Sequence, residues 1–537
     1  MRRTLNDISR HPFDLVVVGA GINGAGVARD AASRGLRVLL LDKGDIGGGT
    51  TSWSTRLIHG GLRYLEHGEW SLVRESLRER ETLLRRIAPH LVAPLAMLIP
   101  IYSGSRRGSL TVRAGMAAYD LLSRDKTLPR HRMLGPEAAR EYAPGLDASR
   151  LKGAALFFDA QVEYAERLAV ENALAARSRG AVVVTHARVE RLLTEGGEAR
   201  GVEFEDVLGG GSHVARAPLV LNAAGPWVDE VLEGVAAGRA GEKLIGGTKG
   251  SHVVVRPFEG APRVAVYAEA GADGRPFFII PWDDKFLIGT TDVRYEGDLD
   301  RVVADEGEIA YLLRETNRVM PPARLAREHV LYTYSGVRPL PSVGAGPEAG
   351  ITRRHFVRAS RVRGLFSVVG GKLTTYRSLA EEVVGLLFKQ LGRAAPPCVT
   401  AREPLPGAEV ADYAAFKDEF KRTSPLAPKS TERLLKVYGA RAADVLRLVL
   451  EDAELARPVS EETGTVGAEV VFAFREEMAE TLTDCLMRRT MVGLNGRLGL
   501  DAAEPAARLA QKHLGWTDGR AASEVEAYGR YVERFVP

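Results

Sequence analysis

A glycine-rich turn between two short apolar segments constrains the fold of this 537-residue chain more than any other feature. Residues 13–18 (FDLVVV) form an apolar run without polar alternation, which is typical of a buried parallel strand. They lead into the turn Gly19–Gly24 (GAGING), a helical pattern that ends near Gly35, and a second apolar segment, 38–41, followed by Asp42. A strand, glycine turn, helix, strand and acid in this order predict a bound dinucleotide.

Each residue of this fingerprint has a physical role. Gly19 allows the tight turn, Gly21 lets the backbone approach a pyrophosphate, and Gly24 lets the helix pack closely against the strand. The positive end of the helix dipole then faces the phosphates. Asp42 is expected to accept hydrogen bonds from a ribose hydroxyl. A glycine turn in an α/β domain without a ligand does not explain why an acid ends the second strand.

The segment after Asp42 favours FAD over NAD as the dinucleotide. An NAD-binding domain would usually continue with another strand–helix unit. Here residues 47–54 (GGGTTSWS) are small and hydroxyl-rich, with little to build a core. Such a stretch suits backbone and hydroxyl contacts along a long cofactor that lies across the sheet.

From residues 57–65 (LIHGGLRYL) onward, the sequence closely resembles the FAD-dependent (respiratory, quinone-linked) glycerol-3-phosphate dehydrogenases. Residues 18–35 match the N-terminal signature of that family, with Ala20 where a third glycine is common, and residues 370–380 (GGKLTTYRSLA) match its second signature. The resemblance covers nearly the whole chain in the order of the family. Its other motifs are 222–227 (NAAGPW), 249–252 (KGSH), 288–292 (IGTTD) and 334–340 (YSGVRPL).

The resemblance implies an α/β fold with a Rossmann-type FAD-binding domain of the glutathione-reductase/D-amino-acid-oxidase kind. This domain is expected to be interleaved with a mixed-sheet substrate domain and followed by an all-α C-terminal domain. The expected boundaries are 12–90, 152–230 and 330–395 for the discontinuous FAD-binding domain, 91–151 and 231–329 for the substrate domain, and 400–537 for the helical domain.

Periodicity predicts the main elements. Helices are expected at 70–87, 167–177, 432–450, 468–490 and 506–514. Strands are expected at 154–159, 181–184, 218–221 and 365–369, and a hairpin at 277–280 and 286–288. Residues 1–11 are basic and polar and are expected to form a disordered lead-in.

The family resemblance implies oxidation of sn-glycerol 3-phosphate to dihydroxyacetone phosphate, with FAD as the hydride acceptor and a membrane quinone as the next electron acceptor. A phosphate dianion needs fixed cations, and arginine suits it best. Arg63, Arg338 and Arg353 lie in turn-rich motifs rather than on polar helix faces, where an arginine usually forms a surface ion pair. By resemblance, the residues holding the phosphate are Arg63, Tyr64, Arg353 and Lys372, and those near the reacting alcohol are Arg338 and Thr290.

Two further expectations concern the reaction centre. Lys372, after two glycines, is expected to begin a helix whose N-terminus faces the flavin pyrimidine ring. His59, flanked by Gly60 and Gly61, is the candidate general base, because its pKa range suits proton removal near neutrality. It could instead hydrogen-bond the flavin or hold the loop. His252 is the weaker rival, and water assisted by an arginine would leave both histidines structural.

The fingerprint and the family signatures together predict the noncovalent FAD contacts. The expected cofactor-binding residues are Gly19, Gly21, Asn23, Gly24, Asp42, Thr51, Ser52, Ser54, Val189, Gly225, Gly371, Leu373 and Thr374.

The composition of the chain mainly excludes classes of partner and site. A net charge of +4 on so long a chain is a weak signal of an anionic partner, and no nucleic-acid partner is expected. Cys398 and Cys485 lie far apart without metal-ligand spacing, which favours a reducing cytosol and argues against an iron–sulfur or zinc site. No stretch of about 18 apolar residues predicts a spanning helix.

Family resemblance favours peripheral association with the inner face of the cell membrane, and a homodimer is possible.

Three alternatives share parts of this pattern. A glycerol-3-phosphate oxidase would use dioxygen in place of quinone and carry the same motifs. The catalytic subunit of a multi-subunit anaerobic dehydrogenase would tend to carry a cysteine-rich C-terminal region, which two scattered cysteines do not supply. A flavin-binding scaffold without catalysis would be expected to have lost residues such as Arg63, Arg338, Lys372 and His59.

Overall fold

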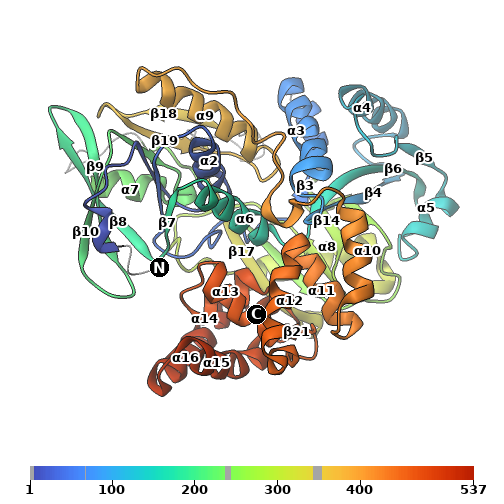
Figure 1. The fold of residues 1–537 in the computed structure, drawn as a ribbon. Coiled ribbons are helices and arrows are strands. Elements are labelled where there is room, and N and C mark those ends of the chain that lie inside the picture. Colours follow the sequence, from blue (N-terminus) through green and yellow to red (C-terminus); the bar gives the residue numbers. More distant parts are fainter. Residues whose placement is uncertain (1–4, 67, 236–242, 343–353, 537) are drawn as a thin grey trace.

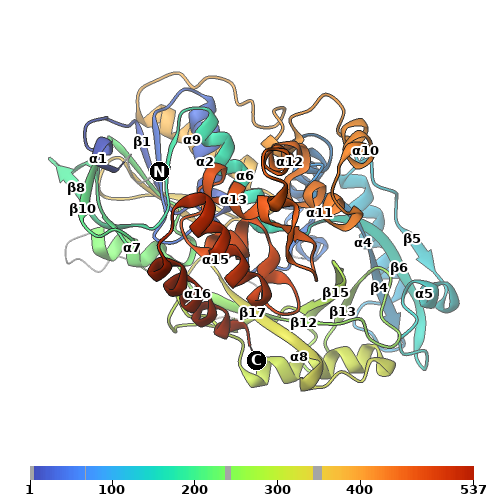
Figure 2. The same cartoon turned by 60° about the horizontal axis from the view of Figure 1, so that its bottom comes forward.

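The computed structural model describes residues 5–66, 68–235, 243–342 and 354–536 (Figure 1). A six-stranded sheet and a ten-stranded sheet form its two main layers, and the last helices of the chain, drawn in red in Figure 1, lie below them. Figure 2 shows the red helices α13 (Gly467–Glu476), α15 (Leu500–Leu514) and α16 (Asp518–Val532) in front of the junction between the two sheets.

The six-stranded sheet is the dinucleotide-binding layer that the sequence predicts. All its neighbouring strands are parallel except the edge pair β18–β19, and the strands expected near 13–18, 38–41, 181–184, 218–221 and 365–369 are confirmed. Its order is β18 (Phe356–Ala359), β19 (Leu365–Val369), β11 (Leu219–Asn222), β1 (Leu15–Val18), β2 (Val38–Leu41) and β7 (Val182–Val184).

Both faces of the central strands β1 and β2 are buried, which explains why these two strands are uniformly apolar. Leu15 and Val17 point to a helical layer, whereas Val16 and Val18 point to a three-stranded antiparallel sheet. The helices are α2 (Ile22–Ser33), α6 (Ala165–Ser178) and α9 (Tyr376–Gln390), and the small sheet contains β8 (Ala187–Glu195), β9 (Glu198–Asp206) and β10 (Ser212–Arg216).

The N-terminal lead-in is more ordered than its composition predicts. Residues Leu5–Ile8 form a short helix, α1, so the expectation of disorder over 1–11 is wrong for this part. Leu5 and Ile8 are buried against the same cluster as Val16 and Val18. Leu5 and Ile8, one helical turn apart, therefore anchor this otherwise polar segment to the hydrophobic core beside β1.

The ten-stranded sheet carries the rest of the α/β region. Its hairpin of β14 and β15 confirms the pair expected at 277–280 and 286–288. Its order is β16 (Val293–Arg294), β12 (Thr248–Val255), β15 (Lys285–Gly289), β14 (Pro276–Trp282), β13 (Ala265–Glu269), β4 (Val92–Tyr102), β6 (Leu151–Val162) and β3 (Leu57–Ile58), with β17 (Val330–Arg338) paired to β12 and β5 (Arg132–Leu134) to β6.

The two faces of the ten-stranded sheet are covered differently. Val253 and Val255 pack under α5 (Pro136–Tyr142) and α8 (Glu306–Val319), whereas Val254 faces the C-terminal helices. Long strands β6 and β17 belong to this sheet, although the proposed domain boundaries assign residues 152–162 and 330–338 to the FAD-binding domain. These residues, together with β3, therefore lie in the larger sheet.

The helical segments differ from expectation where the chain must turn. The single helix predicted at 432–450 breaks at Gly439 (φ +60°), and the one predicted at 468–490 ends at Glu476 before a buried carboxylate, Glu477. The remaining helices are α3 (Trp70–Thr82, continued by a π turn to Ile87), α4 (Ser109–Leu122), α7 (Val228–Val235), α10 (Tyr413–Thr423), α11 (Pro428–Tyr438), α12 (Ala442–Glu451) and α14 (Leu482–Asp484), and β20 (Pro458–Ser460) pairs with β21 (Thr465–Val466).

Within the described ranges, no helix is long and apolar enough to cross a membrane.

Candidate active site

A cavity of about 760 Å³ lies at the carboxyl ends of the parallel strands, beside β12 and β17 of the larger sheet. Ligands of open α/β sheets bind at such an edge. The structure brings most of the predicted site residues into its wall, together with the rival base His252. Those in the wall are Gly19, Gly21, Asn23, Asp42, Thr51, Ser54, His59, Tyr64, Val189, Gly225, Arg338, Gly371, Lys372, Leu373 and Thr374.

The β1–α2 turn leaves backbone, rather than side chains, at the cavity. Gly19 has φ +102°, a conformation that side chains rarely allow, and a Cβ on Gly24 would overlap the carbonyl oxygen of Gly19. The Thr51 hydroxyl accepts a hydrogen bond from the Ile22 amide at 3.0 Å, at the first residue of α2. A Cβ on Gly21 would still lie 3.5 Å from Thr51 Oγ1, so this glycine leaves the turn open for a pyrophosphate.

Asp42 is held in place by main-chain amides. Its Oδ2 accepts from Ala20 N at 2.6 Å and its Oδ1 from Gly44 N at 2.8 Å. Burial raises the pKa of Asp42, while these two backbone hydrogen bonds act in the opposite direction. Each carboxylate oxygen retains a lone pair, so the group is oriented to accept a ribose hydroxyl.

The two family signatures meet in space through Asn23. Its Nδ2 donates to Gly370 O at 3.3 Å, and a Cβ on Gly371 (φ +104°) would lie 2.5 Å from the same atom. The helix after this turn, α9, begins at Tyr376, so the expectation that Lys372 begins it is wrong by four residues. Lys372 instead lies in the turn, whose Thr375 amide donates to the Lys372 carbonyl.

The loop that carries His59 is held from both sides. The His59 amide donates to Thr374 Oγ1 at 3.1 Å, and the Gly60 amide donates to Tyr119 Oη at 2.9 Å. Tyr119 donates in turn to the buried carboxylate of Asp159, at 2.8 Å to Oδ2. Neither Tyr119 nor Asp159 was identified from the sequence, because each lies outside the family motifs that we matched.

Arg338 is fixed by neighbours that come from three strands or their ends. Its Nη1 lies 3.0 Å from Asp292 Oδ1, and its Nη2 donates to Thr290 Oγ1 at 3.0 Å. A Cβ on Gly250 would overlap the guanidinium, which explains the glycine in the KGSH motif. Thr290 is not in the cavity wall and acts on the site through Arg338.

Two of the predicted phosphate-binding residues lie together. Lys372 Nζ is 3.8 Å from the centroid of the Tyr64 ring, a favourable cation–π geometry. Arg63 belongs to the same short helix as Tyr64, Leu62–Leu65, and its side chain is outside the described part of the structure. Arg353 lies outside the described residues altogether.

His252 is buried beside Arg338. Its Nε2 lies 3.0 Å from Thr55 Oγ1, and its ring is 4.8 Å from that of Tyr334. Burial, reinforced by the positive charges of Arg338 and Arg56, holds the pKa of His252 well below its usual range. This imidazole is therefore neutral at physiological pH.

Ser52 and Gly24 are the predicted cofactor-binding residues that do not line the cavity. Ser52 is buried, and its hydroxyl donates to Gly47 O at 2.7 Å. Ser52 therefore shapes the cofactor loop from behind, and Gly24 sets the distance between α2 and β1.

These features fit FAD. The bare glycine turn at the N-terminus of α2, the oriented Asp42 carboxylate and the hydroxyl-rich loop together suit a long dinucleotide with a pyrophosphate in its middle. Among the described residues, no group of three or more His, Cys, Asp or Glu side chains could hold a metal ion.

Comparison with known proteins places this geometry in a family. Residues 14–377 match the model described as FAD dependent oxidoreductase, and residues 398–521 match the C-terminal domain of alpha-glycerophosphate oxidase. A glycerol-3-phosphate dehydrogenase of Synechocystis is 47% identical over 99% of this chain and 98% of its own length. A D-erythritol 1-phosphate dehydrogenase of Brucella abortus is 40% identical over 89% and 94%.

A solved structure supports the same relationship. The glycerol-3-phosphate dehydrogenase of Bacillus halodurans, complexed with FAD, matches with a TM-score of 0.80 and 28% identity. The match covers 100% of this chain and 97% of that chain, so it includes both sheets and the C-terminal helices.

Proposed function

Since the chain belongs to the family of FAD-dependent glycerol-3-phosphate dehydrogenases, we propose that it oxidises sn-glycerol 3-phosphate to dihydroxyacetone phosphate. The observation that carries this proposal is the pair of basic residues, Arg338 and Lys372, in the wall of the same cavity as the dinucleotide fingerprint. Two fixed cations beside a flavin site suit an anionic substrate whose alcohol is to be oxidised. FAD, when bound, supplies the hydride acceptor.

The phosphate would be bound by Lys372 and Tyr64, which already lie in contact, together with Arg63 and Arg353. Arg338 would hold the reacting oxygen. Because Asp292 and Thr290 fix its guanidinium, little reorganisation is needed when negative charge develops on that oxygen.

His59 would take the hydroxyl proton. His59 lines the cavity, and the Thr374 hydroxyl holds its backbone by accepting from the His59 amide at 3.1 Å and lying 3.3 Å from the His59 carbonyl. A clamped loop holds a base at one position relative to the substrate, which general-base catalysis requires. His252 is the competing candidate, because it is neutral and also reaches the cavity wall.

For the electrons, we propose a membrane quinone as the acceptor and peripheral association with the inner face of the cell membrane. The relatives named dehydrogenases support this choice over dioxygen.

A homodimer is also part of the proposal. The cations and histidine that remain at the cavity argue against a flavin-binding scaffold without catalysis.

The proposal is tested by adding substrate to the purified flavoprotein without oxygen and following the visible flavin band. Glycerol 3-phosphate should bleach the band rapidly, whereas glycerol should not. D-erythritol 1-phosphate is included because one relative carries that name. If it bleaches the band faster than glycerol 3-phosphate, the substrate assignment is wrong.

The acceptor is tested on the reduced protein. Readmitting a soluble quinone should restore the yellow band much faster than air alone. Rapid reoxidation by air with stoichiometric hydrogen peroxide would identify an oxidase instead. Binding to anionic lipid vesicles in a flotation assay tests the peripheral association.

A further inference from the structure

The cavity at the dinucleotide fingerprint has a wall that comes from the last sixty residues of the chain. These residues belong to α14, the turn after it, α16 and the short helix that follows α16. They are Thr481, Thr483, Asp484, Arg488, Glu524, Ala527, Tyr531, Arg534 and Phe535. The C-terminal domain therefore contributes side chains to a site that the fingerprint alone was expected to define.

This wall lies next to the ribose-binding acid. His186 Nε2 pairs with Asp484 Oδ2 at 2.9 Å. The amide of His186 donates to Gly44 O at 2.6 Å, and the next amide, Ala187 N, donates to Asp42 O at 2.7 Å. Because Asp42 marks the adenosine half of a bound dinucleotide, α14 faces that half.

A buried ion cluster joins the same loop to the C-terminal domain. Arg489 Nη2 lies 2.7 Å from Asp45 Oδ1, and Arg489 Nη1 lies 2.8 Å from Asp45 Oδ2. Arg488 also pairs with Asp45 through Nε and reaches Asp484 at 2.9 Å through Nη2. All four side chains are nearly fully buried, so removing one partner would leave an uncompensated charge.

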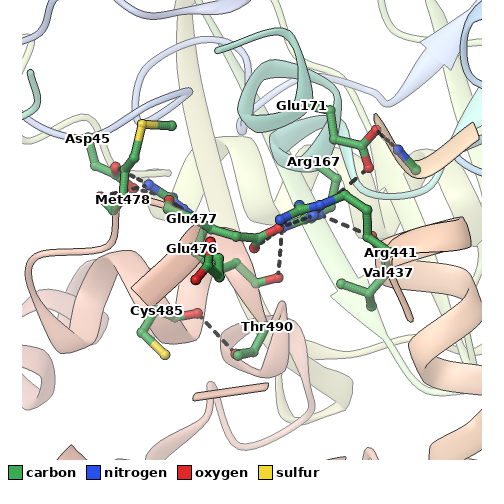
Figure 3. Close-up of polar contacts among 12 residues, drawn as sticks. Asp45, Arg167, Glu171, Val437, Arg441, Glu476, Glu477, Met478, Cys485 and Thr490 are labelled. Atoms are coloured by element: carbon green, nitrogen blue, oxygen red, sulfur yellow. Dashed lines mark hydrogen bonds and ion pairs between the residues drawn. The ribbon is translucent and has the colours of Figure 1, made fainter. Parts of the chain in front are cut away.

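A second buried cluster docks the domain on α6 (Figure 3). Arg167 of α6 reaches the Glu477 carboxylate with both terminal nitrogens, at 2.6 and 2.8 Å. Arg441 pairs with Glu477 as well, and the Arg167 guanidinium lies 4.8 Å from the centroid of the Tyr438 ring. The position of α14 and α16 relative to the six-stranded sheet is thus set by buried charge on both sides.

We propose that the C-terminal domain forms one wall of the adenosine half of the FAD site and that cofactor affinity depends on it. Thr481, Thr483 and the α16 residues in the wall contact the cofactor, whereas Asp45, Asp484, Arg488 and Arg489 are positioning residues that hold this wall in place. Docking of the domain and binding of FAD are then coupled, and each increases the affinity of the other. This inference concerns the cofactor and is independent of which phosphorylated alcohol is oxidised.

A bulky residue in the wall tests the contact directly. Ala527 is exposed and lines the cavity, so Ala527→Trp should leave the apoprotein folded but intrude on the cofactor. The matched control is Ala522→Trp, an exposed alanine on the same helix that lies about 140° around its axis from Ala527. Flavin fluorescence on titration of the apoprotein with FAD should give a dissociation constant at least tenfold higher for Ala527→Trp. Ala522→Trp should stay within twofold of the parent.

Hydrogen exchange provides a measurement that does not depend on a variant. ADP, which carries the adenosine half alone, should slow amide exchange in residues 482–489 and 518–532 of the apoprotein, whereas FMN should not. Residues 413–423 serve as an internal control within the same domain. The proposal is overturned if Ala527→Trp, folded by circular dichroism, binds FAD as tightly as the parent, or if ADP protects the β1–α2 turn but neither C-terminal segment.

The variant Asp484→Asn distinguishes a role in positioning the cavity wall from a contribution to the stability of the fold alone. It removes the charge opposite His186 with little change in shape. Weaker FAD binding by a variant whose apoprotein melts at the parental temperature supports a positioning role. A lower melting temperature with unchanged FAD affinity would make Asp484 structural only and contradict the role assigned to it.

Discussion

The part of the cavity around the β1–α2 turn, here called the cofactor part, and the part at the ends of β12 and β17, here called the reaction part, are lined by different kinds of groups. Around the β1–α2 turn the wall is mostly backbone and small side chains, such as Gly19, Gly21 and Thr51. At the ends of β12 and β17 it consists of charged side chains held by other side chains, as Arg338 is held by Asp292. The first part is fixed by main-chain geometry, and the second by pairs that assemble only in the folded protein.

This difference predicts which property each part controls. A substitution in the backbone-lined part changes the path of the chain and therefore affects folding and cofactor retention together. A substitution among the charged side chains of the reaction part leaves the path of the chain unchanged and should affect substrate binding or turnover, without loss of the cofactor. The following experiments test whether the two parts separate in this way.

Gly24→Ala should have the largest effect. The added Cβ overlaps the carbonyl oxygen of Gly19, and backbone on both sides cannot yield. We expect little soluble protein and no bound flavin, measured as yield and as the ratio of visible to ultraviolet absorbance. Gly115→Ala in α4, where a Cβ meets nothing within 4 Å, is the matched control and should be as stable as the parent. A yellow, stable Gly24→Ala protein would disprove the close packing of α2 on β1.

Arg338→Ala should lower kcat by about 10²–10³-fold, the usual effect of removing a fixed donor from a developing negative charge. The protein should keep its FAD, since Arg338 is held by Asp292 and Thr290 rather than by the fingerprint. Steady-state kinetics and the flavin-to-protein ratio measure the two effects. Full turnover, or loss of flavin with turnover, would show that the two parts of the cavity do not separate.

Lys372→Met should act mainly on substrate binding. Losing one charged contact to the phosphate is expected to raise KM for glycerol 3-phosphate about tenfold or more, with a smaller change in kcat. Lys372→Arg, which keeps the charge, should recover part of the affinity. Equal KM values for the parent and the methionine variant would remove Lys372 from the phosphate site.

The smallest effect concerns His186, at the contact between the cofactor part and the C-terminal domain. Burial lowers the pKa of His186, but the carboxylates of Asp484 and Asp45 outweigh burial and the opposing charge of Arg488, so the pKa lies above its ordinary value of 6.5. The protonated imidazole therefore stabilises the fold fully below pH 6.5, and this contribution is lost as the pH rises through the folded-state pKa.

We expect the melting temperature of the apoprotein to fall between pH 6.5 and 9 by about 1 °C more than that of His186→Asn, because the entropy of unfolding of a chain this long makes 1 kcal/mol worth only about 1 °C. Asparagine is the suitable replacement because His186 has φ +53°, which asparagine tolerates. Parallel pH profiles for the two proteins would show that His186 carries no stabilising proton.

The sequence predicted the backbone-lined part well because its signals are local. The strand at 13–18, the glycine turn and Asp42 are contiguous, and both faces of β1 are buried as its apolar run indicates. Helix ends were predicted less well, since the break at Glu477 depends on a buried partner, Arg167, from another part of the chain.

The charged part was predicted only where family motifs mark it. Arg338 and Lys372 were identified in this way, whereas Asp292 was matched as part of a motif without an assigned role. Tyr119 and Asp159, which hold the His59 loop through Gly60, carry no local pattern at all. The C-terminal wall was missed for the same reason, because Thr483 and Ala527 become neighbours of the fingerprint only through buried ion pairs.

The distance along the chain between the two ends of the cofactor cavity has a consequence for biosynthesis. Thr483 follows Gly21 by about 460 residues along the chain. At ordinary elongation rates of about 5–20 residues per second, a ribosome needs roughly 25–90 s to cover that interval. During this interval the fingerprint has been made but the C-terminal residues of the cavity have not, so the wall that we propose can close over the flavin only after residues 481–535 have been translated.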